Sequence, residues 1–398
     1  MISVDEAVSR ITGAFAVLPA ETVGVADAYN RVLAEDITAR LDHPPAPMSA
    51  MDGYAVRAAD ATPGMELSVV GASPAGHPFE GEVLAGQAVR VFTGGVVPQG
   101  ADTVIMQEDS TPGRRGSVVI KEAARKGDNV RERGLDFKTG ELLFARGHRI
   151  SARDISLLAS ADTAELRVTR KPKVALVATG DELSRPGENR GPGGIVASST
   201  YAMQAMVRNW GGDAVDMGIL RDKPEEFIRL ARSVGDADLI VTQGGASVGE
   251  HDLVQSALGP LGFTLDFWKI AMRPGKPLIF GRLKNTPVLG VPGNPVSAMV
   301  CSILFLEPAI ATMLGTEYRA PIMKAKLGAP LKANGKRQDY LRAKLRFEAG
   351  VAIAEPFKFQ DSSMQKVFAR SDALIIRKVH APAAHEGDEV DVLRLDRA

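Results

Sequence analysis

The sequence contains almost no cysteine, since Cys301 is the only one among its 398 residues. One cysteine excludes an intramolecular disulfide, so we expect a reduced, cytoplasmic compartment. Cys301 stands in the apolar run SAMVCSILFLEP, which predicts a thiol buried in a hydrophobic core. Covalent catalysis by cysteine is therefore not expected.

The chain also has no excess of either charge. Lysine and arginine together number 48, as do aspartate and glutamate. No overall electrostatic field therefore favours nucleic acid or an anionic membrane, and neither is expected as a partner. An anionic ligand would have to be bound by a local group of residues. The length predicts two to four domains.

No uninterrupted membrane-spanning segment is evident. The longest apolar run is broken by Glu307 and Pro308, which predicts a buried helix. The N-terminal segment carries Asp5 and Glu6 and lacks the basic residues of a secretory signal. Its apolar residues have the spacing of an amphipathic helix: Val4, Val8, Ile11 and Phe15.

Several common catalytic motifs are missing. The six histidines have none of the spacings of a zinc site, and no Gly-x-Ser-x-Gly elbow occurs. The glycine-rich segment TQGGASVGEHD, residues 242–252, matches neither the Walker loop nor the dinucleotide fingerprint. The sequence therefore gives no reason to predict an NTPase or a dehydrogenase.

Three patterns of predicted structure follow one another along the chain. Short strands between turns occupy about 64–145, and a short helix follows with Ser151 as N-cap and Asp154 in its first turn. Strands alternate with helices from about 170 to 316, which is typical of a doubly wound parallel α/β sheet. Within it, Asp222 is a candidate N-cap of a helix. Strands return from about 321 and predict a small all-β domain.

In a parallel sheet, ligands bind beyond the carboxyl ends of the strands, so the segments that follow those ends are candidate sites. ATGDEL, residues 178–183, places Asp181 and Glu182 directly after a buried strand, although an ordinary capped turn has the same pattern. The glycines of residues 242–252 allow backbone N–H groups to approach a phosphate, although such turns are often structural. VPGNPVSAM, residues 291–299, predicts a rigid turn and a helix that begins at Pro295 or Val296.

Two cations and a set of carboxylates complete the candidate chemistry. MRPGKPL places Arg273 and Lys276 around a stiff turn. The two cations could form an anion site, or they could be ordinary solvated surface charges. Carboxylates suited to Mg²⁺ and substrate phosphates are Asp52, Asp136, Asp181, Glu182, Asp222 and Asp252. The residues alone thus predict a Mg²⁺-assisted enzyme acting on a phosphate or another oxyanion.

Seven segments, which occur in the same order along the chain as in the family, resemble the molybdopterin molybdenumtransferases. This family also supplies one half of gephyrin. The seven segments span about residues 44–342: PMSAMDGYAV, FTGGVVPQGADTVIMQED, ATGDEL, TQGGASVGEHD, MRPGKPL, VPGNPVSAM and RQDYLRA. The resemblance implies a homodimer of four-domain subunits with a cleft shared between subunits. It divides the chain into an N-terminal helix packed on the α/β domain (1–20), an elongated dimerisation domain (21–50 and 146–169), a β-rich module (51–145), a molybdopterin-binding α/β domain (170–316) and a C-terminal β domain (317–398).

The implied reaction inserts molybdate into adenylylated molybdopterin and releases AMP with the help of Mg²⁺. Catalytic positions implied by the motifs are Asp52, Thr93, Asp136, Glu182, Asp222 and Asp252, of which Asp222 and Asp252 would hold Mg²⁺. Substrate-binding positions are Asp181, Gly244, Gly245, Ser247, Gly249, Pro292, Gly293, Asn294 and Pro295. Molybdate-binding positions are Lys269, Arg273, Lys276, Ser297, Arg337 and Ser362. Other proteins of the cofactor pathway, such as a molybdopterin adenylyltransferase, are the expected partners.

The sequence departs from the family pattern at three places. Arg273 stands where many relatives carry lysine, and Ser199 and Thr200 replace a common Asp/Ser-Asn pair. Ser363 is almost as eligible as Ser362 to contact the oxyanion. Two other functions are alternatives: a molybdopterin-binding scaffold without turnover, and a phosphoanhydride hydrolase that uses the same α/β domain and resembles competence-damage proteins. Those hydrolases normally lack the β-rich module, which favours the transferase.

Overall fold

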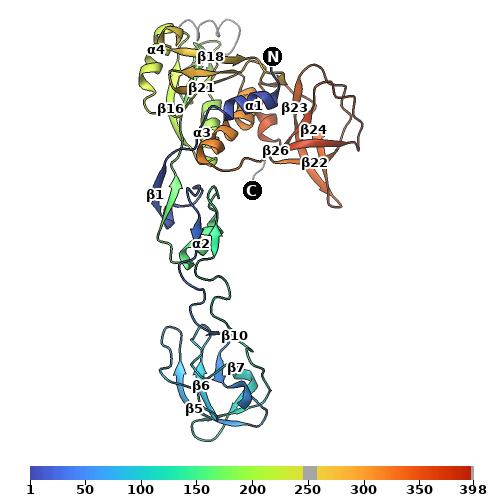
Figure 1. Cartoon of the computed structure of the whole chain (residues 1–398). Helices are drawn as coiled ribbons and strands as arrows, with labels where there is room; N and C mark the ends of the chain where they lie inside the picture. Colours follow the sequence, from blue (N-terminus) through green and yellow to red (C-terminus); the bar gives the residue numbers. More distant parts are fainter. Residues whose placement is uncertain (245–257, 396–398) are drawn as a thin grey trace. The chain divides into compact units, whose positions relative to one another are not determined.

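The structure is a computed structural model that describes residues 1–244 and 258–395. Its contacts divide the chain into two units, and Figure 1 labels many of their elements. Unit 1 comprises Met1–Glu21, Asn30–Ala34 and Val168–Ala398, and unit 2 comprises Thr22–Tyr29 and Glu35–Arg167. Each unit has hydrophobic clusters of its own.

The central element of unit 1 is a six-stranded sheet in the order β16-β13-β17-β21-β20-β18. Its strands are β13 (Lys173–Thr179), β16 (Asp213–Leu220), β17 (Leu239–Gln243), β18 (Phe263–Trp268), β20 (Ile279–Leu283) and β21 (Thr286–Val291). The first four in the order pair in parallel, whereas β20 and β18 pair antiparallel, so the expected parallel sheet is mixed. Chain order reverses beside β13, because β16 lies on one side of it and β17 on the other.

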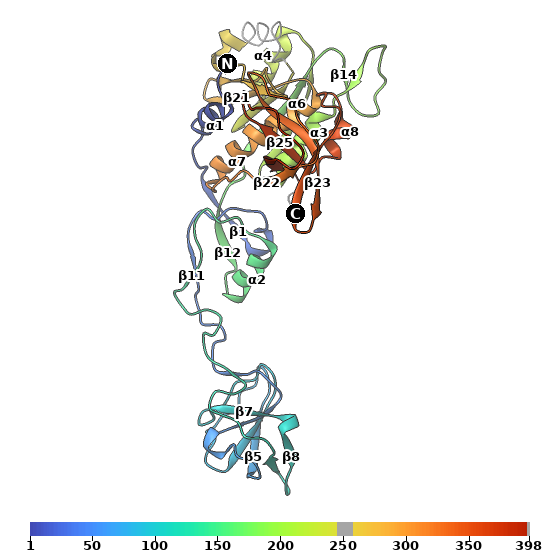
Figure 2. The same cartoon turned by 90° about the vertical axis from the view of Figure 1, so that its right-hand side faces the viewer.

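Helices cover both faces of this sheet. They are α1 (Val4–Thr12), α3 (Ser199–Asn209), α4 (Pro224–Ser233), α6 (Pro295–Cys301) and α7 (Glu307–Leu314), with a π-helical turn, Ser302–Leu306, between the last two. Val174 packs in one cluster with α1, α3, α6 and α7, whereas its neighbour Ala175 packs in another with Phe227 of α4. Consecutive strand residues point to opposite faces, so this division shows a doubly wound α/β layer. Figure 2 shows α1 beside α7.

The apolar run around Cys301 forms the centre of this layer. By length and composition Pro295–Leu314 would suit a membrane span, but 89% of its most apolar window is buried inside the protein. Cys301 is fully buried, as expected, and burial raises the pKa of its thiol well above the usual value. The apolar run therefore forms helices of the hydrophobic core.

A second six-stranded sheet in unit 1 forms the C-terminal β barrel, in the order β19-β23-β24-β22-β26-β25 with a further β23–β25 pairing. Its elements are β19 (Met272–Arg273), β22 (Ile322–Leu327), β23 (Gln338–Glu348), β24 (Val351–Pro356), β25 (Ala373–Arg377) and β26 (Glu389–Arg394), with α8 (Gln365–Ala369). The short strand β19 comes from the α/β part of the chain and pairs Arg273 with Asp339 of β23. This pairing ties the cationic turn to the barrel.

Unit 2 is built on a sheet in the order β7-β4-β6-β5-β9-β8. Its strands are β4 (Gly53–Val56), β5 (Glu66–Ser73), β6 (Gln87–Val91), β7 (Thr103–Met106), β8 (Ser110–Pro112) and β9 (Ser117–Ile120). Adjacent residues Ala55 and Val56 pack in two different clusters, so the sheet is covered on both faces.

Short elements complete the described chain. Paired strands are β1 (Ala20–Gly24) with β12 (Glu165–Thr169), β2 (Ile37–Thr38) with β11 (Leu142–Phe144), β3 (Met48–Ser49) with β10 (Val130–Arg131), and β14 (Leu183–Ser184) with β15 (Ile195–Val196). The remaining helices are α2 (Ala152–Ser160) and the 3₁₀ turns η1 (Val25–Asp27), η2 (Ala58–Asp60), η3 (Gln107–Asp109) and η4 (Gly259–Leu261).

Two predicted helix caps have opposite outcomes. Ser151 is the N-cap of α2, and its hydroxyl and Asp154 form a capping box, as predicted. The prediction that Asp222 caps the next helix of the α/β part is wrong, because α4 begins at Pro224 and Lys223 is its N-cap residue. Proline favours the first helical position since it has no N–H to lose there. The Asp222 backbone N–H instead donates to the Asp181 carboxylate at 3.3 Å.

We predict that Ser151→Ala weakens the start of α2. The loss of the cap leaves the Asp154 N–H without its acceptor and should lower the local stability by about 1 kcal/mol. Hydrogen exchange of the α2 amides measures this local opening. The control is Ser160→Ala in the same helix, whose hydroxyl donates only to the Leu157 carbonyl at 2.8 Å. Equal protection of the α2 amides in wild type and Ser151→Ala would contradict the prediction.

Candidate functional site

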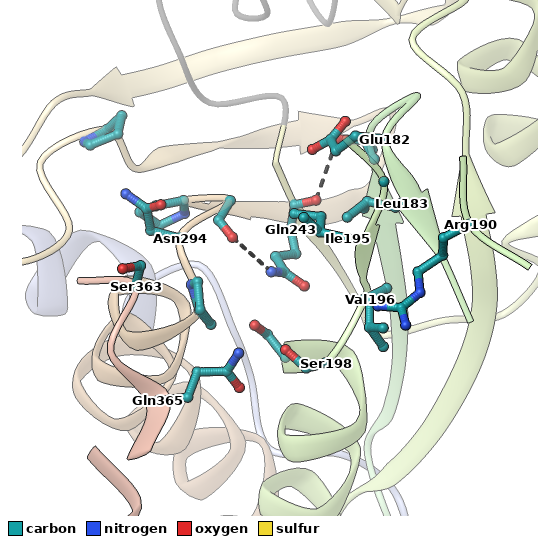
Figure 3. A pocket seen from close by; sticks show the side chains of 18 residues that line it. Glu182, Leu183, Arg190, Ile195, Val196, Ser198, Gln243, Asn294, Ser363 and Gln365 are labelled. Atoms are coloured by element: carbon teal, nitrogen blue, oxygen red, sulfur yellow. Dashed lines mark hydrogen bonds between the residues drawn. The ribbon is translucent and has the colours of Figure 1, made fainter. Parts of the chain in front are cut away.

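A cavity of about 710 Å³ opens at the carboxyl ends of β13 and β17, entirely within unit 1. Thr179 and Gln243, the last residues of these two strands, both line it, and Gln243 is labelled in Figure 3. The other lining residues are Glu182, Leu183, Arg190, Gly194, Ile195, Val196, Ala197, Ser198, Ser199, Pro277, Pro292, Gly293, Asn294, Pro295, Ser363 and Gln365. The structure thus brings two of the predicted loops, 178–183 and 291–299, to one cavity.

The loop after β13 places a carboxylate on the cavity wall. Glu182 is exposed and lines the cavity, whereas Asp181 accepts the backbone N–H of Asp222. Arg221 fixes this loop from the neighbouring strand end, because one guanidinium nitrogen donates to the carbonyls of Asp181 at 2.6 Å and Leu183 at 3.2 Å. Our sequence analysis missed Arg221, since nothing in its spacing indicates contacts with a loop 40 residues away.

Gln243 and Ser199 line the cavity, and each carries a buried polar side-chain atom. Gln243 is 6% exposed and its Nε2 donates to the Gly293 carbonyl at 3.0 Å (Figure 3). Within the part of the chain that the structure describes, Gln243 Oε1 and Ser199 Oγ have no hydrogen-bond partner. Buried polar atoms without partners are rare in folded proteins. Neither residue was predicted as a site residue.

The turn between β21 and α6 meets the serine-bearing turn of the C-terminal barrel. The Asn294 amide donates to the Ser362 hydroxyl at 3.1 Å, and the Val296 N–H donates to the Ser362 carbonyl at 3.1 Å. Ser363 lines the cavity, and its hydroxyl donates to Asp361 at 2.6 Å, which lowers the pKa of that carboxyl. Both serines therefore lie next to the cavity, while Ser297 is buried in α6.

None of the six predicted molybdate ligands, all of which are described, lines the cavity itself. Arg273 forms an ion pair with the buried carboxylate of Asp339, and the Lys269 ammonium lies 3.5 Å from the centre of the Trp268 ring. Lys276 is exposed, and its neighbour Pro277 reaches the cavity. Arg337 is half-buried near the start of β23.

Gly275 gives the cationic turn its close packing. It has φ +111°, and a Cβ there would approach the Cys301 sulfur to 2.6 Å. Only glycine adopts this φ without strain and has no Cβ to clash with the sulfur. Glycine at position 275 therefore allows the turn to pack directly against Cys301 of α6.

Arg342 is a further residue that our sequence analysis missed. It is 1% exposed, and its guanidinium donates to the Asp361 carbonyl at 3.1 Å, next to Ser362. Its backbone N–H and carbonyl both bond the Gln360 amide at 2.9 Å. Arg342 therefore positions the serine turn. The motif RQDYLRA contains two arginines, and only the structure shows which of them holds this turn.

In unit 2 the structure brings Asp52 and Thr93 together. The Thr93 N–H and hydroxyl both donate to Asp52 Oδ1, at 2.7 and 2.9 Å. These bonds, the backbone one first, lower the pKa of the Asp52 carboxyl. Asp136 is exposed, and its N–H donates to the His43 carbonyl at 2.9 Å.

Part of the predicted site lies outside the described residues, namely Gly245, Ser247, Gly249 and Asp252. Gly244 is described; it has φ +90°, and a Cβ there would clash with Thr179 at 2.6 Å. Over residues 1–244 and 258–395, no group of three or more His, Cys, Asp or Glu side chains is placed to hold a metal ion.

Comparison with known proteins gives one consistent result. Residues 2–161 match the MoeA N-terminal region (domain I and II), 175–312 a probable molybdopterin binding domain, and 324–395 the MoeA C-terminal region (domain IV). A molybdopterin molybdenumtransferase of Haemophilus influenzae is 34% identical over 98% of each chain. The one from Bacillus subtilis is 31% identical over 98% of this chain and 94% of its own. A crystal structure of the molybdopterin biosynthesis MoeA protein from Pyrococcus horikosii, 30% identical, superposes over the whole of both chains with a TM-score of 0.85.

We predict that Thr93→Val raises the pKa of the Asp52 carboxyl towards its usual range of about 4, because one of two donors is lost. A carboxyl whose folded pKa is depressed stabilises the fold above its unfolded pKa, and this contribution is lost as pH falls through the folded value. The acid-dependent loss of stability in unit 2 should therefore shrink in Thr93→Val. Carboxyl-carbon NMR titration measures the pKa directly.

The matched control is Thr139→Val, because Thr139 donates to Asp42 in the same way, with 2.7 and 2.8 Å bonds to Oδ1. That change should raise the pKa of the Asp42 carboxyl from about 2 and leave Asp52 unchanged. An Asp52 titration that is the same in wild type and Thr93→Val would show that the hydroxyl bond does not act on the carboxyl.

Proposed function

The chain belongs to the MoeA family of molybdopterin molybdenumtransferases, and we propose that it inserts molybdate into adenylylated molybdopterin with release of AMP. The observation that carries the proposal is the cavity at the ends of β13 and β17, which combines the Glu182 carboxylate with buried polar groups and the Pro292–Pro295 turn. A cavity of about 710 Å³ is large enough for a pterin with its side chain.

The residues present fit a Mg²⁺ ion bound together with substrate. The Asp181 carboxylate and the Asp222 N–H are in contact, so two carboxylate-bearing loops meet beside Glu182. Mg²⁺ is usually held by one or two carboxylates and substrate phosphates, so it needs no larger protein cluster. Asp222 would hold the ion together with Asp252, which lies outside the described residues. Bound Mg²⁺ would neutralise charge on the phosphoanhydride and make AMP a better leaving group.

Molybdate is a tetrahedral dianion, so its binding requires cations and hydroxyl or N–H donors. Lys269, Arg273 and Lys276 supply cations on one turn, Arg337 supplies another, and Ser297 and Ser362 supply hydroxyls. Asp339 orients Arg273 through one end of its guanidinium and leaves other N–H groups for the oxyanion. Arg342 acts as a positioning residue, because it fixes the turn that carries Ser362.

We further propose that the protein works as a cytoplasmic homodimer in which Asp52, Thr93 and Asp136 complete the cleft of the second subunit. The support is that these exposed polar residues belong to unit 2 and have no role in the core of that unit. Adenylylated molybdopterin is a reactive intermediate, so an adenylyltransferase is the expected supplier.

Glu182→Gln should reduce AMP release by about 100-fold or more, because it removes a charge at the reacting phosphates and keeps the side-chain volume. The assay measures AMP from adenylylated molybdopterin with molybdate and Mg²⁺. Glu225→Gln, on the exposed first turn of α4, is the control and should retain wild-type turnover. A wild-type protein that leaves this substrate intact would refute the transferase. Binding without turnover would instead support a scaffold.

A mixture of Asp52→Ala and Glu182→Ala proteins should recover part of the activity that each lacks alone. In a mixed dimer with a shared cleft, one of the two sites contains both native carboxylates. Random reassociation gives about half mixed dimers, so recovery of up to about a quarter of wild-type activity is expected. The subunits are exchanged under mild denaturation, and dimer content is measured by light scattering. Inactive mixed dimers would place Asp52 and Glu182 in the same subunit's site.

A further inference from the structure

Three strand ends of unit 2 meet beside Asp52. β4 pairs antiparallel with both β6 and β7, so the start of β4 lies beside the carboxyl ends of its two neighbours. Asp52 directly precedes β4, while Thr93 and Gln107 follow β6 and β7. Thr93 bonds the Asp52 carboxylate, and the Gln107 N–H donates to the Asp52 carbonyl at 3.0 Å. The position of Asp52 therefore depends on how these three ends are held together.

The side chain of Arg90 connects the three ends. Arg90 lies opposite Tyr54 in the pairing of β6 with β4. Its Nη1 donates to the Gly53 carbonyl at 3.2 Å, and its Nη2 donates to Gln107 Oε1. Gly53 follows Asp52 in the chain, and Gln107 bonds the Asp52 backbone. A planar guanidinium presents its N–H groups in fixed directions, so one side chain can bond both partners at once.

Two aromatic rings hold this guanidinium in place. Its central carbon lies 5.0 Å from the centre of the Tyr54 ring and 5.1 Å from the centre of the Phe92 ring. Ring faces attract a cation at such distances, so the two rings restrict the directions that Arg90 can take. The charge of Arg90 also acts on Asp52. The Thr93 bonds lower the pKa of the Asp52 carboxyl most, and the positive charge of Arg90 lowers it further.

We propose that Arg90 is a positioning residue, which fixes the backbone on both sides of Asp52 while Thr93 orients the carboxylate. This inference rests on the proposed function of Asp52, and it deepens that function by naming the residue that holds Asp52 in place. Arg90 acts through Asp52 and does not need to touch the substrate. The bridge requires two donors in one plane, which lysine lacks although it keeps the charge. Lysine at position 90 therefore separates the effect of the bridge from the effect of the charge.

The first test compares full-length wild type with Arg90→Lys in the assay of AMP release. The lysine ammonium cannot bond Gly53 and Gln107 together, so Asp52 should shift from its position. We expect kcat to fall by about 10- to 100-fold, because small displacements of a site residue have effects of this size. The pKa of the Asp52 carboxyl should rise towards its usual range of about 4, because the shift weakens the Thr93 bonds. Carboxyl-carbon NMR titration measures this pKa without substrate.

A double variant shows whether Arg90 acts through Asp52. Arg90→Lys combined with Asp52→Asn should be no slower than Asp52→Asn alone, because the charge that Arg90 positions is already absent. An arginine that only stabilised the sheet would slow both backgrounds by the same factor. The control is Arg125→Lys, which changes an exposed arginine of the same unit and should leave kcat and the Asp52 pKa unchanged.

The role of Arg90 would be overturned by an Arg90→Lys protein with wild-type kcat and wild-type Asp52 pKa, or by equal slowing in both backgrounds. The proposed function would still stand, because wild type releases AMP in both cases. If wild type releases no AMP, the proposed function is wrong, and the NMR titration of Arg90→Lys decides whether Arg90 positions Asp52. If Arg90→Lys does not fold, Gln107→Ala takes its place in both measurements, since it removes one acceptor of Arg90 and leaves the arginine intact.

Discussion

The reversal of strand order beside β13 is the constraint on which the candidate site depends. The chain leaves β13 towards β16 on one side and leaves β17 towards β18, at the far edge of the other side, so the two connections diverge. Divergent connections leave a crevice outside the carboxyl ends of neighbouring parallel strands. Thr179 and Gln243, which end β13 and β17, lie at this crevice. The position of the cavity therefore follows from topology, and the side chains determine only what it binds.

The C-terminal barrel is joined to this crevice by backbone pairing. β19 and β23 pair at Arg273 and Asp339, while the serine turn bonds Asn294 and Val296 at the start of α6. The cationic turn also rests on Cys301, against which only glycine fits at position 275. A long side chain that is held in place before binding loses less conformational entropy, so this fixed arrangement would favour oxyanion binding by the proposed ligand Arg273.

Much of this arrangement could be predicted from the sequence, but its contacts could not. A continuous apolar run predicted the buried strand 173–179, and proline at the first helical position predicted the helix at Pro295. The sequence also indicated Glu182 and the Pro292–Pro295 turn, since both follow strand ends. Arg221, Gln243 and Arg342 were missed because their partners lie 18 to 50 residues away. The prediction of an N-cap at Asp222 was wrong, because backbone geometry determines which of several adjacent residues becomes the N-cap.

Asp52, which we propose as a site residue, differs in one respect from Asp42, whose carboxylate is bound by a threonine in the same way. Asp42 accepts the N–H and hydroxyl of Thr139 on Oδ1 and the Arg133 guanidinium on Oδ2, so both of its oxygens are used inside unit 2. Asp52 accepts the same two groups from Thr93 on Oδ1, and its Oδ2 has no hydrogen bond among the described residues. The Thr93 bonds keep the carboxylate charged and fix its direction, while Oδ2 stays available as an acceptor. A structural turn at Asp52 needs only Oδ1 as an acceptor. The availability of Oδ2 on a carboxylate that is held charged and oriented is therefore not explained by turn chemistry, and it is what a cleft shared between subunits would use.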